Sequence, residues 1–280
     1  ESLLDSLIAS EENPLTDPEE IKKVLRELSF KNRVYLTSQD GWLHTRIYEY
    51  LLPGDNSANL TAVPPAQTYS FLYTADGIRV TDNWYRTEKG ALYEGFTLMK
   101  DSAGREMQTT VVRPDGIGIN FALWDAGDPE TRESAMRDSN TVEYAPTQLE
   151  ETQADWAIKD VDSYKAFAVA QEGWSHSINL KYFNDESHKV FVVYLETYTP
   201  QLVNIPGVKP LVSGSAVKYF FDTETGELVA TETSVHTQDG NWIVTAYSEM
   251  RQFVYNQLPS EQNEQYEILV NKLNAIRGEK

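Results

Sequence analysis

The sequence predicts a mainly β protein of the α+β class, in which antiparallel meander sheets carry helices at the start, in the middle and at the end of the chain. Tyr, Phe and Trp are abundant (16, 10 and 6 residues), and aromatic residues favour strands. Short apolar stretches are separated by turns rich in Gly and Asp, which is typical of hairpins. The third observation is internal repetition, which indicates that the sheets arose from a duplication.

Two pairs of segments carry the repetition. QDGWLHTRIYEY (39–50) matches QEGWSHSINLKY (171–182), and TEKGALYEGFTLMKDSAGREMQTT (87–110) matches TETGELVATETSVHTQDGNWIVTA (223–246) without gaps. Both matches occur in the same order and at nearly the same separation. We therefore interpret them as one structural unit used twice.

The repetition divides the chain into three segments. Residues 1–125 hold an N-terminal helix and the first β repeat, 126–162 form an acidic helical connector, and 163–280 hold the second β repeat and a C-terminal helix. Two arrangements of the repeats remain open. They form two related sheets packed against each other, which we prefer, or they share one curved sheet.

The first helix has clear start signals. Asp17 is a capping residue, Pro18 takes the first helical position and Glu20 completes a capping box. Its apolar face predicts packing on a sheet. We expect the helix to end near Phe30 and a strand to follow over residues 33–38.

Two further helices follow later in the chain. The connector helix is predicted within residues 148–161 and packs through Leu149, Trp156 and Ile158. The terminal helix follows Pro259, with Ser260 as its cap. Five apolar residues share one face of the terminal helix: Tyr266, Leu269, Val270, Leu273 and Ile276.

The remaining strands are predicted from alternation and turn signals. In the first repeat they cover 42–51, 67–74, 77–86, 91–100 and 105–112, and in the second 164–170, 174–183, 189–198, 215–222, 227–237 and 241–249. The stretch HKVFVVYLETY (188–198) is apolar on both faces, which predicts a central strand covered on both sides. DTETGE (222–227) faintly resembles a calcium-binding loop, but a hairpin turn explains it better.

The repeated Trp-x-His strand supplies the candidate binding residues. Period-two alternation places Trp42, His44 and Arg46 on one inward face, and Trp174, His176 and Tyr182 on the corresponding face of the second repeat. A buried neutral His is the simplest interpretation of each histidine, and a binding groove and acid–base chemistry are the alternatives. Arg46 requires a partner or an anionic ligand, because an unpaired charge is costly to bury.

A long, unusually apolar loop over residues 199–214 completes this candidate site. Ile205 and Leu211 are its candidate ligand contacts, since soluble proteins rarely leave such residues exposed together. The loop serves either as a lid over a ligand or as a plug that buries itself against the sheet.

Composition excludes several classes of site and partner. The net charge of −19 argues against nucleic-acid binding, because so acidic a surface repels phosphate backbones as well as anionic lipid headgroups. The absence of Cys excludes disulfides and thiolate chemistry. No GxSxG, HExxH, P-loop or GxGxxG motif occurs. We therefore expect no catalytic residue, no metal and no cofactor, and no stretch is apolar enough for a transmembrane helix.

Residues 217–247 (VKYFFDTETGELVATETSVHTQDGNWIVTAY) resemble the LolA/LppX/RseB-like envelope proteins. The resemblance lies in an aromatic strand that ends in an Asp-x-x-Thr-Gly turn and continues into a long strand and a Gly-centred turn. It implies a half-open antiparallel barrel with helices against its concave face, a fold that holds acyl chains or lipoproteins. A tandem duplication and a Tyr- and Trp-rich inward face depart from that pattern.

These observations together predict a non-catalytic binding or interaction protein that works outside the cytoplasm, in a bacterial envelope or secreted, with a signal or anchor segment removed. Its partner is an apolar small molecule or another envelope protein, and we expect a monomer. Two alternatives remain open: a carboxylate-dependent hydrolase, which needs two converging Asp or Glu of raised pKa, and a purely structural surface module.

Overall fold

A computed structural model describes most of the chain, and its described residues form two compact units. Unit 1 is drawn from Glu1–Tyr35, Glu49–Ala66 and Glu151–Met250, and unit 2 from Leu36–Tyr48, Gln67–Glu150 and Arg251–Lys280. The described residues are 13–51, 78–88, 91–101, 104, 106–122, 141–143, 147–148, 152–174, 188–198, 212–237 and 241–279.

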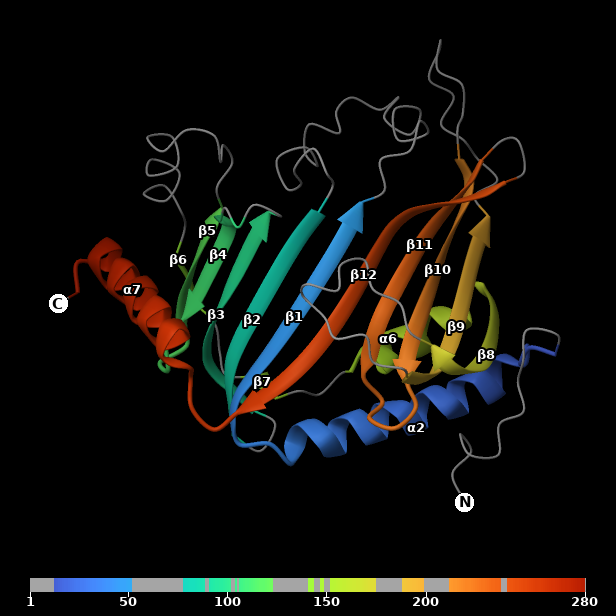
Figure 1. Cartoon of the computed structure of the whole chain (residues 1–280), viewed down its shortest axis with the longest axis horizontal. Helices are drawn as coiled ribbons and strands as arrows, with labels where there is room; N and C mark the ends of the chain where they lie inside the picture. The colour runs from blue at the N-terminus through green and yellow to red at the C-terminus, as the bar shows by residue number, and fades with distance from the viewer. Residues whose placement is uncertain are drawn as a thin grey trace, which may run out of the picture. The chain divides into compact units, whose positions relative to one another are not determined.

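Unit 1 combines two helices with an antiparallel meander (Figure 1). Its strands follow the hydrogen-bonded order β8-β9-β10-β11-β12, so each pairs with its neighbour in sequence. The elements are α2 (Pro18–Thr37), α6 (Gln153–Val161), β8 (Lys165–Trp174), β9 (His188–Tyr198), β10 (Val212–Asp222), β11 (Leu228–Thr237) and β12 (Trp242–Tyr255).

Unit 2 is a second meander with one helix, α7 (Ser260–Arg277). Strands β2 to β6 pair in sequence order, and the short β7 pairs with β3. The strands are β1 (Gly41–Leu51), β2 (Ile78–Glu88), β3 (Ala91–Asp101), β4 (Glu106–Val112), β5 (Ile117–Ala122), β6 (Thr141–Glu143) and β7 (Thr147–Gln148).

The predicted class, mainly β with helices packed on antiparallel strands, is confirmed. The preferred arrangement of two separate sheets is wrong. β12 belongs to both units, Trp242–Met250 to unit 1 and Arg251–Tyr255 to unit 2. One hydrogen-bonded order, β6-β5-β4-β3-β2-β1-β12-β11-β10-β9-β8, therefore includes both repeats. A strand of 14 residues is long enough for its first part to belong to one unit and its last part to the other.

The compact units cut across the predicted segments 1–125, 126–162 and 163–280. The N-terminal helix α2 packs with the strands of the second repeat, and the C-terminal helix α7 packs with those of the first. Each helix therefore crosses the predicted boundary to reach the sheet face that it covers.

The two repeat matches differ in how they lie on the strands. In the second match, Thr97 lies within β3 and Thr233 within β11. In the first match, Trp42 stands at the start of β1, whereas Trp174 ends β8. The internal duplication stays a prediction of the sequence.

Helix α2 is longer than expected. Asp17 caps it as predicted, accepting hydrogen bonds from the backbone N–H groups of Glu19 (2.8 Å) and Glu20 (3.2 Å). The predicted end near Phe30 and the strand over 33–38 are wrong, because the helix continues to Thr37. Buried positions continue at helical spacing through Asn32 and Leu36. Tertiary packing thus overrides the weak strand preference of this stretch.

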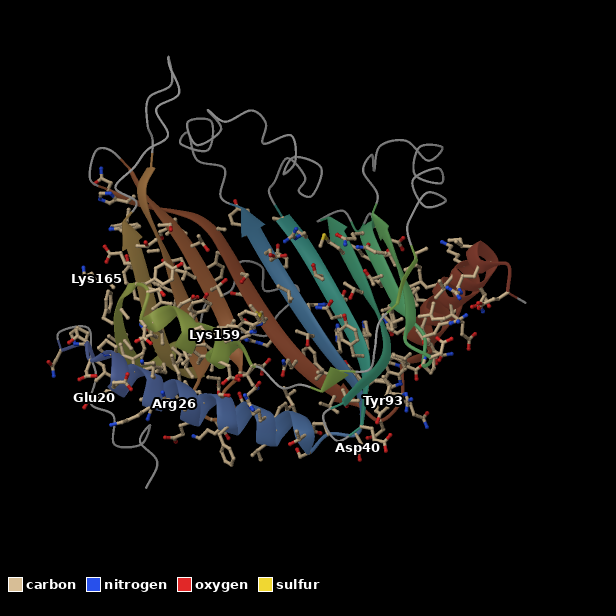
Figure 2. The ribbon with its side chains drawn as sticks, turned by 180° about the vertical axis from the view of Figure 1, so that it is seen from behind. Glu20, Arg26, Asp40, Tyr93, Lys159 and Lys165 are labelled. Atoms are coloured by element: carbon tan, nitrogen blue, oxygen red, sulfur yellow. The ribbon has the colours of Figure 1, made fainter. Side chains whose placement is uncertain are left out.

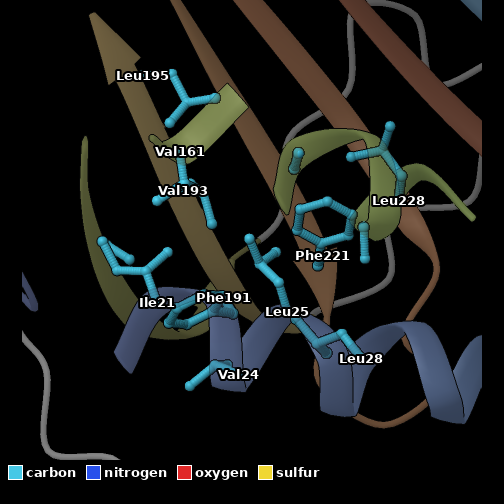
Figure 3. Close-up of a cluster of buried hydrophobic side chains, with 13 residues drawn as sticks. Ile21, Val24, Leu25, Leu28, Val161, Phe191, Val193, Leu195, Phe221 and Leu228 are labelled. Carbon is cyan, nitrogen blue, oxygen red and sulfur yellow. The ribbon is translucent and has the colours of Figure 1, made fainter. Parts of the chain in front are cut away.

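The core of unit 1 lies between α2, α6 and one face of β8–β11. Figure 2 shows the side on which α2 and α6 cover the strands. Figure 3 shows the contact: Ile21, Val24, Leu25 and Leu28 of α2 meet Phe191, Val193 and Leu195 of β9, with Phe221 and Leu228 alongside. All of these are buried. The burial of such side chains is worth about 1.5–3 kcal/mol each before entropy costs.

Strand β9 is central and covered on both sides, as predicted. It pairs with β8 on one edge and β10 on the other. Phe191 and Val193 face the helices, whereas Val190 and Val192 join a second buried cluster with Phe220 of β10. The alternating faces of one strand therefore supply two cores.

The predicted hairpin turn at DTETGE is confirmed. The Asp222 carboxylate accepts hydrogen bonds from the backbone N–H groups of Glu224 (2.8 Å) and Thr225 (2.9 Å), and Gly226 has φ +74°. The turn also contacts α2: Lys31 Nζ donates to the carbonyl oxygen of Thr223 (2.9 Å). The Asp222 carboxylate therefore organises the turn, and the backbone of the next residue contacts the helix.

The connector helix α6 starts at a capping box formed by Thr152 and Asp155. Ala154, Ala157 and Val161 are its buried residues, and Ile158 packs against the same cluster. The prediction that Trp156 packs inward is wrong, because its side chain is 53% exposed. Small residues on the buried face let the helix approach the sheet, and this places Trp156 outward.

Helix α7 covers the strands of unit 2. Leu269 and Leu273 are buried, and Tyr266 and Val270 pack beside them, as predicted. The predicted inward Ile276 is 41% exposed. Ser260 is the first helical residue and Pro259 the cap, with no side-chain capping hydrogen bond, so Ser260 is not the cap.

We expect Leu273→Ala to lower the free energy of unfolding by about 2–5 kcal/mol. The Leu273 side chain is fully buried between α7 and the strands of unit 2, and its truncation leaves a cavity. Ile276→Ala on the same helix is the matched control and should change stability by no more than about 0.5 kcal/mol. Urea unfolding of both variants measures this. Equal, small effects would show that α7 does not pack on the strands.

Candidate functional site

The inward face of β1 is the best-defined part of the predicted site. Trp42, His44 and Tyr48 alternate along the strand and are 9%, 4% and 0% exposed. Arg46, between His44 and Tyr48 in this series, is half-buried. Leu43, which lies between Trp42 and His44, is also buried, so burial along β1 alternates only in part.

Aromatic rings gather on this face from five elements, β1, β2, β3, β12 and α7. We call the five residues Trp42, Trp84, Phe96, Tyr255 and Tyr266 the aromatic wall. Trp42 meets Tyr266 of α7 edge to face, with ring centroids 5.7 Å apart. Phe96 lies between Trp84 (6.3 Å) and Tyr266 (5.7 Å). Such pairs add about 0.5–1.5 kcal/mol beyond area burial, so the wall is a rigid support for Trp42.

The phenol of Tyr266 fixes α7 against the strands. Its hydroxyl donates to Glu94 Oε2 (2.8 Å) and lies 3.2 Å from the carbonyl oxygen of Val112. Glu94 is in turn paired with Arg86. Burial, together with the Glu94 carboxylate, raises the pKa of Tyr266 far above its ordinary value. Tyr266 therefore stays a neutral hydrogen-bond donor at any physiological pH.

A buried charge cluster lies beside the wall. Asp82 of β2 accepts hydrogen bonds from His44 Nε2 (2.7 Å) and Arg46 Nε (2.6 Å) at Oδ1, and from Arg46 Nη2 (3.1 Å) at Oδ2. The His44 ring stacks on Trp84 at 3.8 Å between centroids. Asp82 is thus the partner that Arg46 was predicted to require.

Electrostatics at Asp82 favour the charged form. Burial alone would raise the pKa of its carboxyl, but the hydrogen bonds from His44 and Arg46 hold that pKa below its usual value. Among the residues that the structure describes, His44 Nδ1 is buried without a hydrogen-bond partner. The cluster has the character of a satisfied ion pair and offers no vacant cation for an anionic ligand.

A groove of about 500 Å³ opens beside Trp42. It is lined by the indole of Trp42, the β12–α7 connection and the first turns of α7. Its lining residues are Trp42, Asn256, Gln257, Leu258, Ser260, Asn263, Glu264 and Glu267. The groove combines two apolar side chains with three amides, a hydroxyl and two carboxylates, so its lining is more polar than that of most small-ligand sites.

The structure brings together only part of the predicted site. Trp42, His44 and Arg46 share one face, but Arg46 and His44 are engaged with Asp82 rather than with the groove. Trp174 ends β8. The remaining candidates, His176, Tyr182, Ile205 and Leu211, and most of the loop 199–214, lie outside the described residues.

Sequence reasoning missed the residues that complete the site. Asp82 was one of 43 acidic residues, and only the pairing of β1 with β2 selects it. Glu264 and Glu267 flank Tyr266, the first residue of the predicted apolar face of α7, and no pattern in the sequence marks them as site residues. The unmet charge of Arg46 was the one signal that could have directed attention to a carboxylate on the neighbouring strand.

Within the described ranges, neither a metal site nor a membrane-spanning helix is found. No group of three or more His, Asp and Glu side chains there is placed to hold a metal ion. No helix among those residues has the length and apolar character needed to cross a bilayer.

Comparison with known proteins gives weak structural likenesses. No protein-family model matches the chain, and no curated protein sequence matches it. A domain described as outer membrane lipoprotein-sorting, from Vibrio parahaemolyticus, is 11% identical with a TM-score of 0.27, covering 91% of this chain and 100% of that one. A LolA superfamily protein from Nitrosomonas europaea is 9% identical with a TM-score of 0.23, covering 85% and 96%.

A third likeness is a β-barrel-like protein from Brucella abortus, 9% identical with a TM-score of 0.21, covering 78% of this chain and 99% of that one. The weak resemblance to LolA-like proteins predicted from residues 217–247 is confirmed as a weak one. Because these TM-scores are low, the likenesses do not indicate a function, and any function must be inferred from the residues of this chain.

Proposed function

We propose that this chain is a non-catalytic, extracytoplasmic binding protein whose ligand occupies the groove beside Trp42. The observation that carries the proposal is the position of the Trp42 indole, which belongs both to the aromatic wall and to the lining of a groove of about 500 Å³. A rigidly supported aromatic ring at the edge of a cavity is a frequent ligand platform.

The lining residues favour an amphiphilic ligand with a cationic group. Trp42 and Leu258 offer apolar contact, whereas Glu264 and Glu267 are exposed carboxylates. Neither carboxylate forms an ion pair with a described residue, although Glu267 accepts a hydrogen bond from Asn263 (3.0 Å). A small molecule that presents an apolar part to Trp42 and an ammonium group to the carboxylates would satisfy both.

The alternative of a carboxylate-dependent hydrolase finds no support in the described residues. That chemistry needs a carboxyl of raised pKa. At Asp82 and Asp155, hydrogen bonds outweigh the effect of burial and lower the carboxyl pKa. At Asp115 and Glu279, the hydrogen bond from Arg113 lowers the carboxyl pKa. These carboxylates are structural ion-pair partners and are held in their charged form.

An extracytoplasmic location is supported by sequence character. The chain is acidic, free of Cys and rich in Tyr, and residues 217–247 resemble envelope proteins. Secretion of the full-length protein, tested by cell fractionation, addresses this part of the proposal independently of ligand binding.

The binding test uses the indole N–H signals of the six Trp residues in a ¹H–¹⁵N NMR spectrum. Trp42→Phe assigns the Trp42 signal by its loss. On titration with phenethylammonium we expect the Trp42 signal to move, and on titration with 3-phenylpropanoate, which has a similar apolar part and the opposite charge, we expect no movement. Trp156, which is exposed on α6, is the internal control for unspecific stacking.

The double variant Glu264→Gln with Glu267→Gln should weaken phenethylammonium binding about fivefold, the effect of two exposed ion pairs, without lowering the melting temperature. The proposal is wrong when neither probe moves the Trp42 signal, or when Trp42 and Trp156 respond alike. Equal binding of both probes would support a ligand site at the groove and contradict its preference for cations.

A further inference from the structure

Tyr266 is not one of the residues that line the groove beside Trp42, but it lies between two residues that do. Glu264 precedes it by two positions, and Glu267 follows it directly. Because a helix rises about 1.5 Å per residue, the three residues share one turn of α7. The Tyr266 side chain is half-buried, and both carboxylates are exposed. The position of Tyr266 against the strands therefore fixes where the two carboxylates stand.

The part of α7 that lines the groove has few other attachments to the strands of unit 2 (Figure 1). Pro259 caps the helix and supplies no side-chain hydrogen bond. The buried residues of the helix, Leu269 and Leu273, both follow the groove-lining turns. Tyr266 is the first described residue of α7 that packs against the buried apolar cluster of unit 2. The first turns of α7 therefore depend on Tyr266 for their position.

The Tyr266 side chain is held both at its ring and at its hydroxyl. The ring lies 5.7 Å from Trp42, edge to face, and 5.7 Å from Phe96 between centroids. The hydroxyl donates to Glu94 Oε2 of β3 (2.8 Å) and lies 3.2 Å from the carbonyl oxygen of Val112 of β4. Ring contacts tolerate sliding, whereas a hydrogen bond weakens steeply when its angle changes. The ring thus supports the indole, and the hydroxyl fixes the turn of the helix.

We propose that the Tyr266 hydroxyl positions Glu264 and Glu267 in the groove. Held there beside the Trp42 indole, the two carboxylates give the groove its preference for a cationic ligand over an uncharged one of the same shape. This inference rests on the proposed function of the groove. Coulomb attraction falls with distance and is screened by water, so carboxylates that move away from the indole lose their hold on an ammonium group. Contact of an apolar ligand part with Trp42 needs only the ring of Tyr266.

The test follows the Trp42 indole N–H signal of the whole chain during titration with phenethylammonium and with 2-phenylethanol, which replaces the ammonium group with an uncharged hydroxyl. Tyr266→Phe keeps the ring and removes its hydroxyl. We expect this variant to bind phenethylammonium about fivefold more weakly, the loss expected of Glu264→Gln with Glu267→Gln. Its affinity for 2-phenylethanol should equal that of the wild type. Glu94 keeps its ion pair with Arg86 in this variant, so we expect the fold to be retained.

Combining Tyr266→Phe with the two Glu→Gln substitutions separates positioning from general support of the fold. If Tyr266 acts through Glu264 and Glu267, the combined variant binds phenethylammonium no more weakly than the two Glu→Gln substitutions alone, because residues that act as one unit are not additive. A merely structural role of Tyr266 would give losses that add, and it would weaken binding of 2-phenylethanol as well.

The matched control is Tyr85→Phe, which removes another hydrogen-bonded tyrosine hydroxyl of unit 2. Tyr85 lies 3.3 Å from Thr97 Oγ1 and follows Trp84 on β2, so it faces the other side of the sheet. This variant should bind both probes like the wild type, and melting temperatures establish that each variant is folded.

The outcomes distinguish this inference from the proposed function. A wild type that binds neither probe overturns the proposed function, and the role of Tyr266 with it. A wild type that prefers phenethylammonium, together with a Tyr266→Phe variant of unchanged preference or with additive losses, overturns the role of Tyr266 alone. An equal loss in Tyr85→Phe also contradicts that role, because the effect would then not be specific to α7.

Discussion

Replacing Gly226 with Ala should lower the free energy of unfolding by about 3–5 kcal/mol, an exceptional loss for one substitution in a turn. Two causes act together. Gly226 has φ +74°, a conformation that costs an L-residue about 1–2 kcal/mol. A Cβ at this position would also lie 2.0 Å from the carbonyl oxygen of Leu28. That oxygen belongs to the backbone of α2, so the turn or the helix must move.

Gly104→Ala is the matched control for this prediction. Gly104 has a similar φ of +80°, but a Cβ there would meet nothing within 4 Å. We expect Gly104→Ala to cost only the conformational part, about 1–2 kcal/mol. Chemical denaturation of both variants gives the two values. A loss in Gly226→Ala no larger than that in Gly104→Ala would show that α2 does not approach the turn this closely.

The second large effect is expected from Asp82→Asn, which should lower the free energy of unfolding by about 3 kcal/mol. The substitution leaves Arg46 and His44 without their common counter-charge in a buried place, and removing one partner of a buried ion pair is strongly destabilising. The control is Asp115→Asn. Asp115 pairs with Arg113 but is 51% exposed, and exposed pairs contribute at most about 1 kcal/mol.

The Asp82 effect has a defined pH dependence. Because the pKa of Asp82 is lowered in the folded protein, its stabilising contribution is complete above the unfolded-chain pKa of about 3.9. The contribution is lost as the pH falls through the lower folded value. The stability gap between wild type and Asp82→Asn should therefore be constant from pH 7 to about pH 5 and narrow below about pH 4. A gap that does not change down to pH 2 would contradict the assigned role of Asp82.

The sequence by itself determined the elements that depend on local pattern. Asp17 and Pro18 set the start of α2, the DTETGE turn formed at the predicted residues, and the two-sided apolar strand 188–198 became the central β9. Capping, turn chemistry and period-two alternation act within a few residues, so they can be recognised in one chain.

Only the tertiary structure decided which elements meet. The extension of α2 past Phe30 depends on Asp155 and on a turn almost two hundred residues later. The selection of Asp82 as the partner of Arg46 depends on which strand lies beside β1. The outward position of Trp156 depends on the small residues that α6 buries. Pairing and packing join residues far apart in the chain, and no local pattern specifies a partner at that distance.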